Sequence, residues 1–147
     1  MGEQMTIIDE VEQFKRDLRS YAYRRMKLEQ IEAELRYCAI KMTGVSSPSP
    51  DRIPGTPQSN GGKSPGWYAL LEKEEKLIKR RDDLIREIRF VDEVLARMDP
   101  LEAQIIKRIY IDREGIDNVA EDVAYHSRTL YKKMQSAIKR ALNALST

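Results

Sequence analysis

The sequence predicts an all-α protein in which two long amphipathic helices precede a C-terminal three-helix unit. Three observations lead to this prediction. Apolar residues recur at intervals of three and four along two stretches of more than thirty residues, a spacing that marks one side of a helix. Five of the six prolines lie in the segment between these stretches. Signals that begin and end short helices follow residue 98.

The first long helix is expected over about residues 6–43. Its apolar positions alternate by four and three residues, which is close to a coiled-coil repeat. Arg24 and Arg25 interrupt this pattern, so we expect a phase shift or a solvent-filled gap there. The apolar seam of this helix consists of Ile7, Val11, Phe14, Leu18, Tyr21, Leu28, Ile31, Leu35, Cys38 and Met42.

A second long helix is expected over about residues 66–98. The intervening residues 44–65 hold five prolines and four of the seven glycines, so this segment should hold no helix and should form a flexible linker. Two helices of matched length favour either an antiparallel hairpin within the chain or pairing between subunits, and we expect a homo-oligomer built through them. The second seam consists of Leu70, Leu77, Leu84, Ile88, Val91, Leu95 and Met98.

Residues 99–147 are predicted to form a helix-turn-helix domain, distinct from a helical arm made of residues 1–98. Asp99 can cap a helix whose first position holds Pro100, because proline has no backbone N–H that would be left unpaired there. The expected elements are, in order, a helix from Pro100 through Tyr110, a break at Gly115, a short helix over 116–123, a turn over 124–126 and a last helix from His126 or Ser127.

Positive charge concentrates in the last helix. Ser127 to Thr147 hold five basic and no acidic residues, whereas residues 99–125 hold seven acidic and three basic ones. Cations also gather at helix C-termini because of the helix dipole, but Arg128 would lie at the opposite end. Segregated positive charge instead favours a polyanion such as nucleic acid. The expected inward face is Leu130, Met134, Ala137, Ala141 and Leu145, and the residues expected to contact double-stranded DNA are Ser127, Arg128, Tyr131, Lys132, Gln135 and Lys139.

Several functional classes are not expected from the composition. One cysteine, Cys38, and one histidine, His126, exclude a disulfide framework and a Cys/His zinc site. No apolar run approaches the roughly 18 residues of a membrane-spanning helix, and the first residues lack the pattern of a signal peptide. No phosphate-binding glycine motif, activated nucleophile or metal-ligand spacing is found. We therefore expect a protein that is not an enzyme, needs no cofactor and does not bind membranes.

Three segments of the C-terminal part carry a resemblance to a known family. They are Arg108-Ile109-Tyr110-Ile111-Asp112, Val119-Ala120-Glu121 and Ser127-Arg128-Thr129-Leu130-Tyr131. With these segments, residues 99–145 resemble region 4 of bacterial sigma factors, and more closely the phage late-transcription regulators of the ArpU and RinA type. The long charged helix, the linker and the charged segment from Leu71 to Leu77 also resemble the upstream part of these regulators.

The resemblance implies an activator of phage or prophage late genes in the cytoplasm of a bacterial host. Such a regulator would recruit host RNA polymerase or act like a sigma factor at the promoter. The sequence departs from the pattern at Ala124, where such turns often hold glycine, and at Gly115, where Ser or Thr often caps the short helix. Two alternatives remain open: a small terminase subunit that recognises packaging DNA, and a coiled-coil interaction protein that does not bind DNA.

Overall fold

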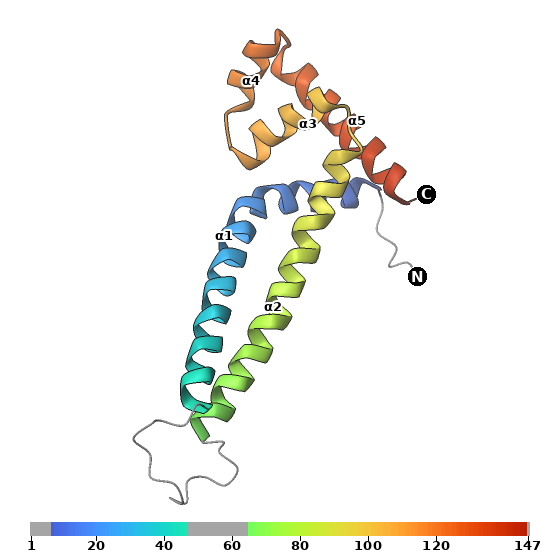
Figure 1. Cartoon of the computed structure of the whole chain (residues 1–147). Coiled ribbons are helices and arrows are strands. Elements are labelled where there is room, and N and C mark those ends of the chain that lie inside the picture. The colour runs from blue at the N-terminus through green and yellow to red at the C-terminus, as the bar shows by residue number, and fades with distance from the viewer. Residues whose placement is uncertain (1–6, 47–64, 147) are drawn as a thin grey trace, which may run out of the picture. The chain divides into compact units, whose positions relative to one another are not determined.

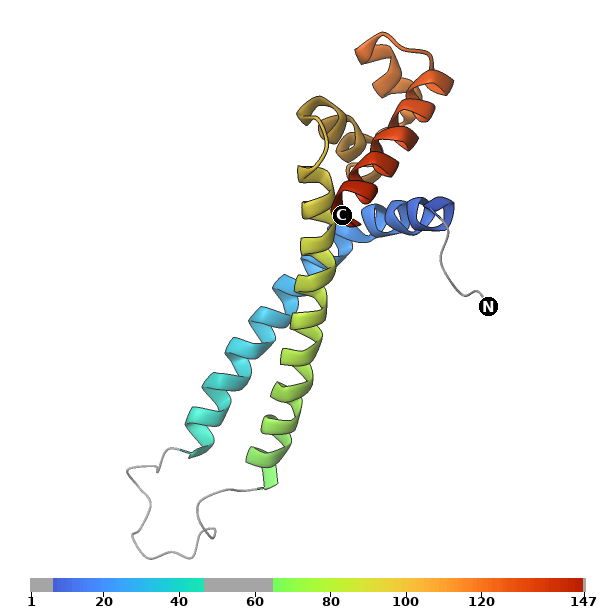
Figure 2. The same ribbon diagram turned by 90° about the vertical axis from the view of Figure 1, so that its right-hand side faces the viewer.

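The computed structural model describes residues 7–46 and 65–146, which lie in helices or in the turns that join them (Figures 1 and 2). No strand occurs in these two ranges, so the predicted all-α fold is confirmed. None of the described helices has an apolar stretch long enough to cross a bilayer. The elements are α1 (Ile7–Ser46), α2 (Pro65–Ala96), α3 (Pro100–Ile106), the π-helical segment η2 (Lys107–Ile111), α4 (Ile116–Val123) and α5 (Ser127–Ser146).

The two long helices extend into both ends of the predicted linker. Helix α1 continues to Ser46, and α2 begins at Pro65, so the expectation that residues 44–65 hold no helix is wrong at these ends. Pro65 is compatible with a helix because it stands at the N-terminus of α2, where a backbone N–H would have no partner in the helix. The rest of the predicted linker, residues 47–64, lies outside the described residues.

The chain divides into two compact units that both include parts of α1 and α2. We call Met26–Ile85 the hairpin unit, and Met1–Arg25 together with Arg86–Thr147 the bundle unit. This division differs from the expected one between residues 98 and 99. The seam of α1 does not face a single neighbour along its whole length, because its first part belongs to one unit and its second part to the other.

In the hairpin unit, the two long helices run side by side in opposite directions (Figures 1 and 2). Their predicted seams supply the buried residues of this unit, Ile31, Cys38 and Leu84. Of the two arrangements left open by the sequence, the structure therefore contains the hairpin within one chain.

In the bundle unit, the C-terminal helices share one hydrophobic core with the ends of the long helices. Helix α5 packs against α3 and α4, and η2 packs against α4. Apart from Val94, the core residues from α1 and α2 have the seam positions predicted from the sequence. Together the core consists of Val11, Phe14, Leu18, Val91, Val94, Leu95, Met98, Ile105, Ile106, Tyr110, Val119, Ala120, Leu130, Met134, Ala137, Ile138, Ala141 and Leu142.

The start of α3 follows the sequence prediction, whereas its C-terminal continuation does not. The Asp99 carboxylate accepts a hydrogen bond from the Leu101 N–H at 3.2 Å, with Pro100 at the first helical position. The chain then widens into η2, where the Asp112 N–H donates to the Lys107 carbonyl. A single α-helix through residue 110 was expected, so this π-helical segment is a correction. Its wider turn precedes Arg113, which has a positive φ of 58°.

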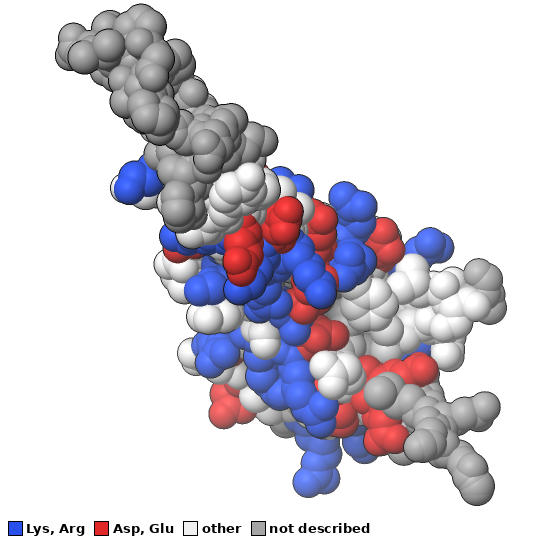
Figure 3. Space-filling view, turned by 90° about the horizontal axis from the view of Figure 1, so that it is seen from below, with Lys and Arg blue, Asp and Glu red and all other residues white. Residues whose placement is uncertain are grey.

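Charged side chains of both signs lie close together on the face of the molecule shown in Figure 3. This mixture agrees with the nearly balanced composition of 26 basic and 24 acidic residues.

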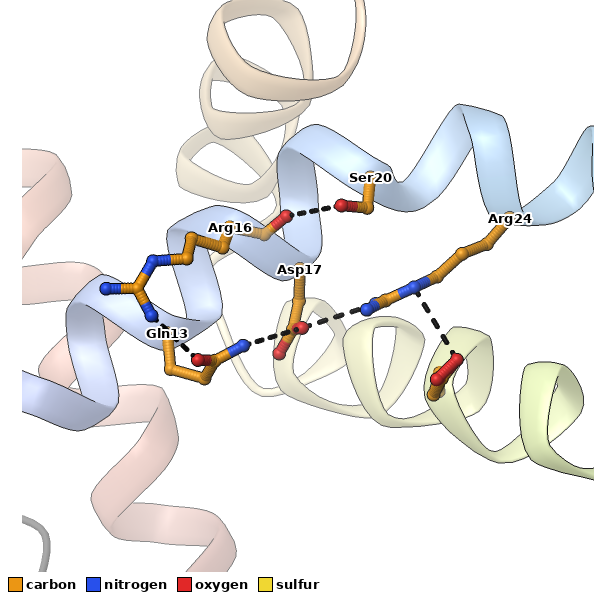
Figure 4. Close-up of polar contacts among 6 residues, drawn as sticks. Gln13, Arg16, Asp17, Ser20 and Arg24 are labelled. Carbon is orange, nitrogen blue, oxygen red and sulfur yellow. Dashed lines mark hydrogen bonds and ion pairs between the residues drawn. The ribbon is translucent and has the colours of Figure 1, made fainter.

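Arg24 shows how the structure accommodates an arginine that interrupts the α1 seam. Its guanidinium contacts the carboxylate of Asp17 on α1 at 3.2 Å and that of Glu87 on α2 at 3.6 Å. Figure 4 shows this side chain extending from α1 toward α2. Along α1, the Asp17 carboxylate also accepts a hydrogen bond from the side-chain amide of Gln13. Arg24 thus links the two long helices within the bundle unit through ion pairs instead of apolar contact.

Candidate nucleic-acid interface

Helices α4 and α5 meet at a tight turn, as expected for a helix-turn-helix. Ala124 adopts the left-handed conformation with φ 61° and ψ 43°. Its N–H donates to the Glu121 carbonyl at 3.2 Å, and the Tyr125 N–H donates to the Ala120 carbonyl at 2.9 Å. This pair of hydrogen bonds forms a Schellman motif, which usually has glycine at the left-handed position. The turn is therefore tight although Ala124 replaces the expected glycine.

A side-chain hydrogen bond fixes the first turn of α5 against α4. The Ser127 hydroxyl donates to the carboxylate of Asp117, which lies in the first turn of α4. Ser127 is half-buried and already has this partner. Of the residues predicted to contact DNA, Ser127 thus has a structural role between the two helices.

Arg108 holds α4 from its other side. Its guanidinium forms two hydrogen bonds with Glu114, at 2.9 and 2.7 Å, and a third with Asp122 of α4 at 2.6 Å. The hydrogen bonds to Glu114 and Asp122 raise the pKa of Arg108, and the hydrogen bond from Arg108 lowers the pKa of Glu114. The Asp122 carboxylate of α4 thus has a cationic partner, which it shares with Glu114. The sequence showed Arg108 only as part of a motif and did not indicate this role.

The exposed face of α5 is narrower than the predicted one, because more of the helix is buried. Ile138 and Leu142 are buried in addition to the predicted inward residues Leu130, Met134, Ala137 and Ala141. At about 100° per residue, these two widen the buried arc toward Tyr131 and Gln135. The exposed polar residues on the opposite side are Arg128, Thr129, Lys132, Lys133, Ser136, Arg140 and Asn143.

Gln135 does not occupy the outward position expected from the sequence. Its side-chain oxygen is buried and accepts no hydrogen bond from the described residues. The reason is its place one turn after Tyr131 and next to the buried arc that includes Ile138. Gln135 therefore cannot present its side-chain oxygen to a base edge without a rearrangement of its side chain.

Tyr131 is half exposed but points toward α1. Its hydroxyl oxygen accepts a hydrogen bond from the ammonium of Lys15 at 3.1 Å, and the same ammonium lies 4.6 Å from the centre of its ring. The predicted DNA contact of Tyr131 is therefore replaced in the structure by a contact with the N-terminal helix.

Among the described residues, Lys15 is the charged residue that is buried, with only 2% of its surface exposed. It also contacts the Glu12 carboxylate at 3.3 Å. Burial lowers the pKa of Lys15, but Tyr131, Tyr110 and Glu12 outweigh this effect and raise the pKa above its ordinary value, so the side chain stays charged. A sequence signal existed: Lys15 follows Phe14 and lies four residues after Val11, within the buried stripe of α1.

Three basic residues of α5 are available for an anionic partner. Within residues 7–46 and 65–146, Arg128, Lys132 and Lys139 form no ion pair, whereas Arg140 contacts Glu102 at 2.8 Å and Lys133 lies over the Tyr125 ring at 5.2 Å. Arg128 and Lys132 are exposed, and Lys139 is half-buried. These three residues were all among the predicted DNA contacts.

A groove of about 540 Å³ lies between α3 and α5, beside this basic face. Ile105, Leu130 and Met134 contribute to its apolar lining, and Lys132 and Lys133 to its basic lining. The same face of α5 thus offers both cations and a hollow with apolar walls.

Comparison of the chain with protein-family models, with curated proteins and with solved structures finds no match.

Proposed function

We propose that this protein binds double-stranded DNA through the exposed basic face of α5 and regulates transcription. The observation that carries the proposal is the location of Arg128, Lys132 and Lys139 on one helix that has no acidic residue and that follows a tight turn. Lysine and arginine bind phosphates, and arginine also contacts guanine in the major groove through two hydrogen bonds.

The charges of α4 are compatible with this orientation. Two of its carboxylates have partners, because Asp117 accepts a hydrogen bond from Ser127 and Asp122 accepts one from Arg108. Glu121 is exposed and would be repelled by a phosphate. Helix α5, and not α4, is therefore the element proposed to approach the duplex.

The resemblance to the ArpU and RinA regulators suggests the biological setting. It supports phage or prophage late genes as targets, the cytoplasm of a bacterial host as the location and host RNA polymerase as a further partner. Polymerase recruitment and a sigma-like role at the promoter both remain compatible with this proposal.

The experiment is a titration of the full chain against labelled duplexes selected from a random-sequence library, repeated at several salt concentrations. Arg128→Ala and Lys132→Ala should each reduce affinity, and each lost phosphate contact should lower the salt slope by about one unit. Lys76→Ala is the matched control, because it removes an exposed lysine of the hairpin unit. It should leave the affinity unchanged.

A protein partner is the second candidate, favoured by the groove between α3 and α5. A variant with Arg128, Lys132 and Lys139 all changed to Ala separates the two functions. Unchanged duplex binding by this variant would contradict the DNA interface on α5. If the wild type binds no duplex either, the second candidate function, binding of a protein partner, would remain.

A further inference from the structure

The hairpin unit exposes a second apolar stripe on α1, distinct from the seam that packs inside the chain. Met26, Tyr37 and Ile40 are large apolar residues with 48%, 56% and 70% of their surfaces exposed. Ala33 and Gln30 are exposed as well and lie between them. None of the five side chains carries a charge.

The stripe has the spacing of a coiled-coil seam. Its members follow one another at intervals of four, three, four and three residues, from Met26 through Gln30, Ala33 and Tyr37 to Ile40. Met26 and Ala33 each precede a buried seam residue, Ile31 and Cys38, by five positions. Five residues correspond to about 140° around a helix, so the stripe faces away from the intramolecular seam.

We propose that this stripe binds the same stripe of a second copy of the chain, with the two α1 helices antiparallel. In a seven-residue coiled-coil repeat, Gln30 and Tyr37 occupy the first (a) position, and Met26 and Ala33 occupy the fourth (d) position. In the antiparallel orientation, the a positions of one helix face the d positions of the other. One register then places Met26 opposite the partner's Tyr37, and Gln30 opposite the partner's Ala33. The register has two-fold symmetry, as expected of a homodimer.

The charges beside the stripe select this orientation. Antiparallel pairing places Glu29 near the partner's Arg36, and Lys27 near the partner's Glu34, so both flanks join opposite charges. Parallel pairing would instead bring Glu29 near the partner's Glu34, and Arg36 near the partner's Lys41. Flanking charges set orientation in coiled coils, and like charges in close contact oppose association.

The buried seams of the hairpin cannot provide this contact. Ile31, Cys38 and Leu84 are at most 3% exposed within the single chain, and opening the hairpin would expose them to water. The second stripe needs no such rearrangement. Self-association through it is independent of the proposed DNA binding, so either can fail without the other.

Sedimentation of the full chain in the absence of DNA, from about 1 to about 200 µM protein, tests the proposal. The wild type should pass from monomer to dimer over this range. Ala33→Lys should raise the dimer dissociation constant by about tenfold or more, because it places a charge in the stripe opposite the partner's Gln30. Ala39→Lys is the matched control: it makes the same substitution at another exposed alanine of the same helix, outside the stripe, and should leave the constant within about twofold of wild type.

A charge exchange tests the orientation without touching an apolar residue. Glu29→Arg should weaken the antiparallel dimer by opposing the partner's Arg36, and adding Arg36→Glu should restore it. In a parallel dimer, Glu29→Arg would tighten association by meeting the partner's Glu34. A wild type that stays monomeric, a dimer insensitive to Ala33→Lys, or tightening by Glu29→Arg would each overturn the proposal. Helical signal in the far ultraviolet confirms that each variant is folded.

Discussion

Lys15 and Tyr131 are 116 residues apart in the sequence and meet through a hydrogen bond of 3.1 Å. This contact joins the N-terminal helix to the basic helix α5. It places a buried positive charge next to the helix that carries the proposed DNA-binding face. The stability of the C-terminal helices should therefore depend on residues from the other end of the chain.

Tyr131→Phe should lower the free energy of unfolding by about 1–2 kcal/mol, because it leaves the buried Lys15 ammonium with one partner fewer. Lys15→Met should cost less, since methionine keeps the apolar stem and the Tyr131 hydroxyl can turn to water. In the double variant the two effects should not add, with a coupling energy of about 1 kcal/mol. Thermal melts of the four proteins measure this cycle. Strict additivity would contradict a direct interaction.

Ala124→Gly should stabilise the protein by about 1 kcal/mol. Ala124 has a positive φ of 61°, which costs a residue with a side chain roughly 1–2 kcal/mol, whereas glycine adopts this conformation without steric cost. Ala39→Gly provides the matched control, because Ala39 is exposed inside α1. There the same substitution should destabilise by about 1 kcal/mol. Denaturant unfolding measures both changes, and equal signs would contradict the turn geometry.

Local signals account for the parts of the fold that the sequence predicted well. Asp99 and Pro100 marked the start of α3, and the short helix over residues 116–123 was found with the same bounds. These signals depend only on neighbouring residues. The π-helical segment has no comparable local signature, and a continuous helix was therefore predicted through Tyr110.

Contacts between distant segments could not be predicted in the same way. The spacing of Phe14 and Leu18 showed that one side of α1 is buried, but not that it packs into the core of the C-terminal helices. The same limit applies to the candidate site. Arg128, Lys132 and Lys139 were predicted as available cations, whereas Tyr131 was assigned to the outward face because nothing in the sequence indicated its contact with Lys15.

Gln135→Met should stabilise the protein by about 1 kcal/mol, because it removes a buried oxygen that has no hydrogen-bond partner among the described residues. Duplex affinity should stay unchanged. Ser136→Met is the matched control at the next position, which is exposed. It should change stability by less than about 0.5 kcal/mol. It should weaken duplex binding, because it places a large apolar side chain on the exposed face of α5. Thermal melts and duplex titrations of both variants are the measurements. Weaker DNA binding by Gln135→Met alone would mean that Gln135 faces outward, as expected from the sequence.

Isolated residues 99–147 should not unfold cooperatively, although they contain all the residues proposed to contact DNA. Their core in the full chain includes Val11, Phe14 and Leu18 from α1 and several residues from the end of α2. Without these partners, Ile138 and Leu142 would be exposed to water, and each buried side chain of this size contributes about 1.5–3 kcal/mol. Circular dichroism during heating should show a broad transition or none. A sharp melt at the temperature of the full chain would mean that the C-terminal segment folds alone.

Removal of the hairpin unit should leave a protein that still unfolds cooperatively. Arg24 and Glu87 contact each other at 3.6 Å, so the chain ends at residues 25 and 86 lie within reach of a short glycine-serine connection. A protein in which this connection replaces residues 26–85 keeps the whole bundle core, because no member of that core comes from the deleted part. It should melt cooperatively, whereas the shorter fragment 99–147 should not. It also lacks the exposed stripe of α1, and should therefore be monomeric at concentrations where the full chain is dimeric. Loss of the cooperative melt in this shortened protein would show that the bundle unit depends on the hairpin unit for folding.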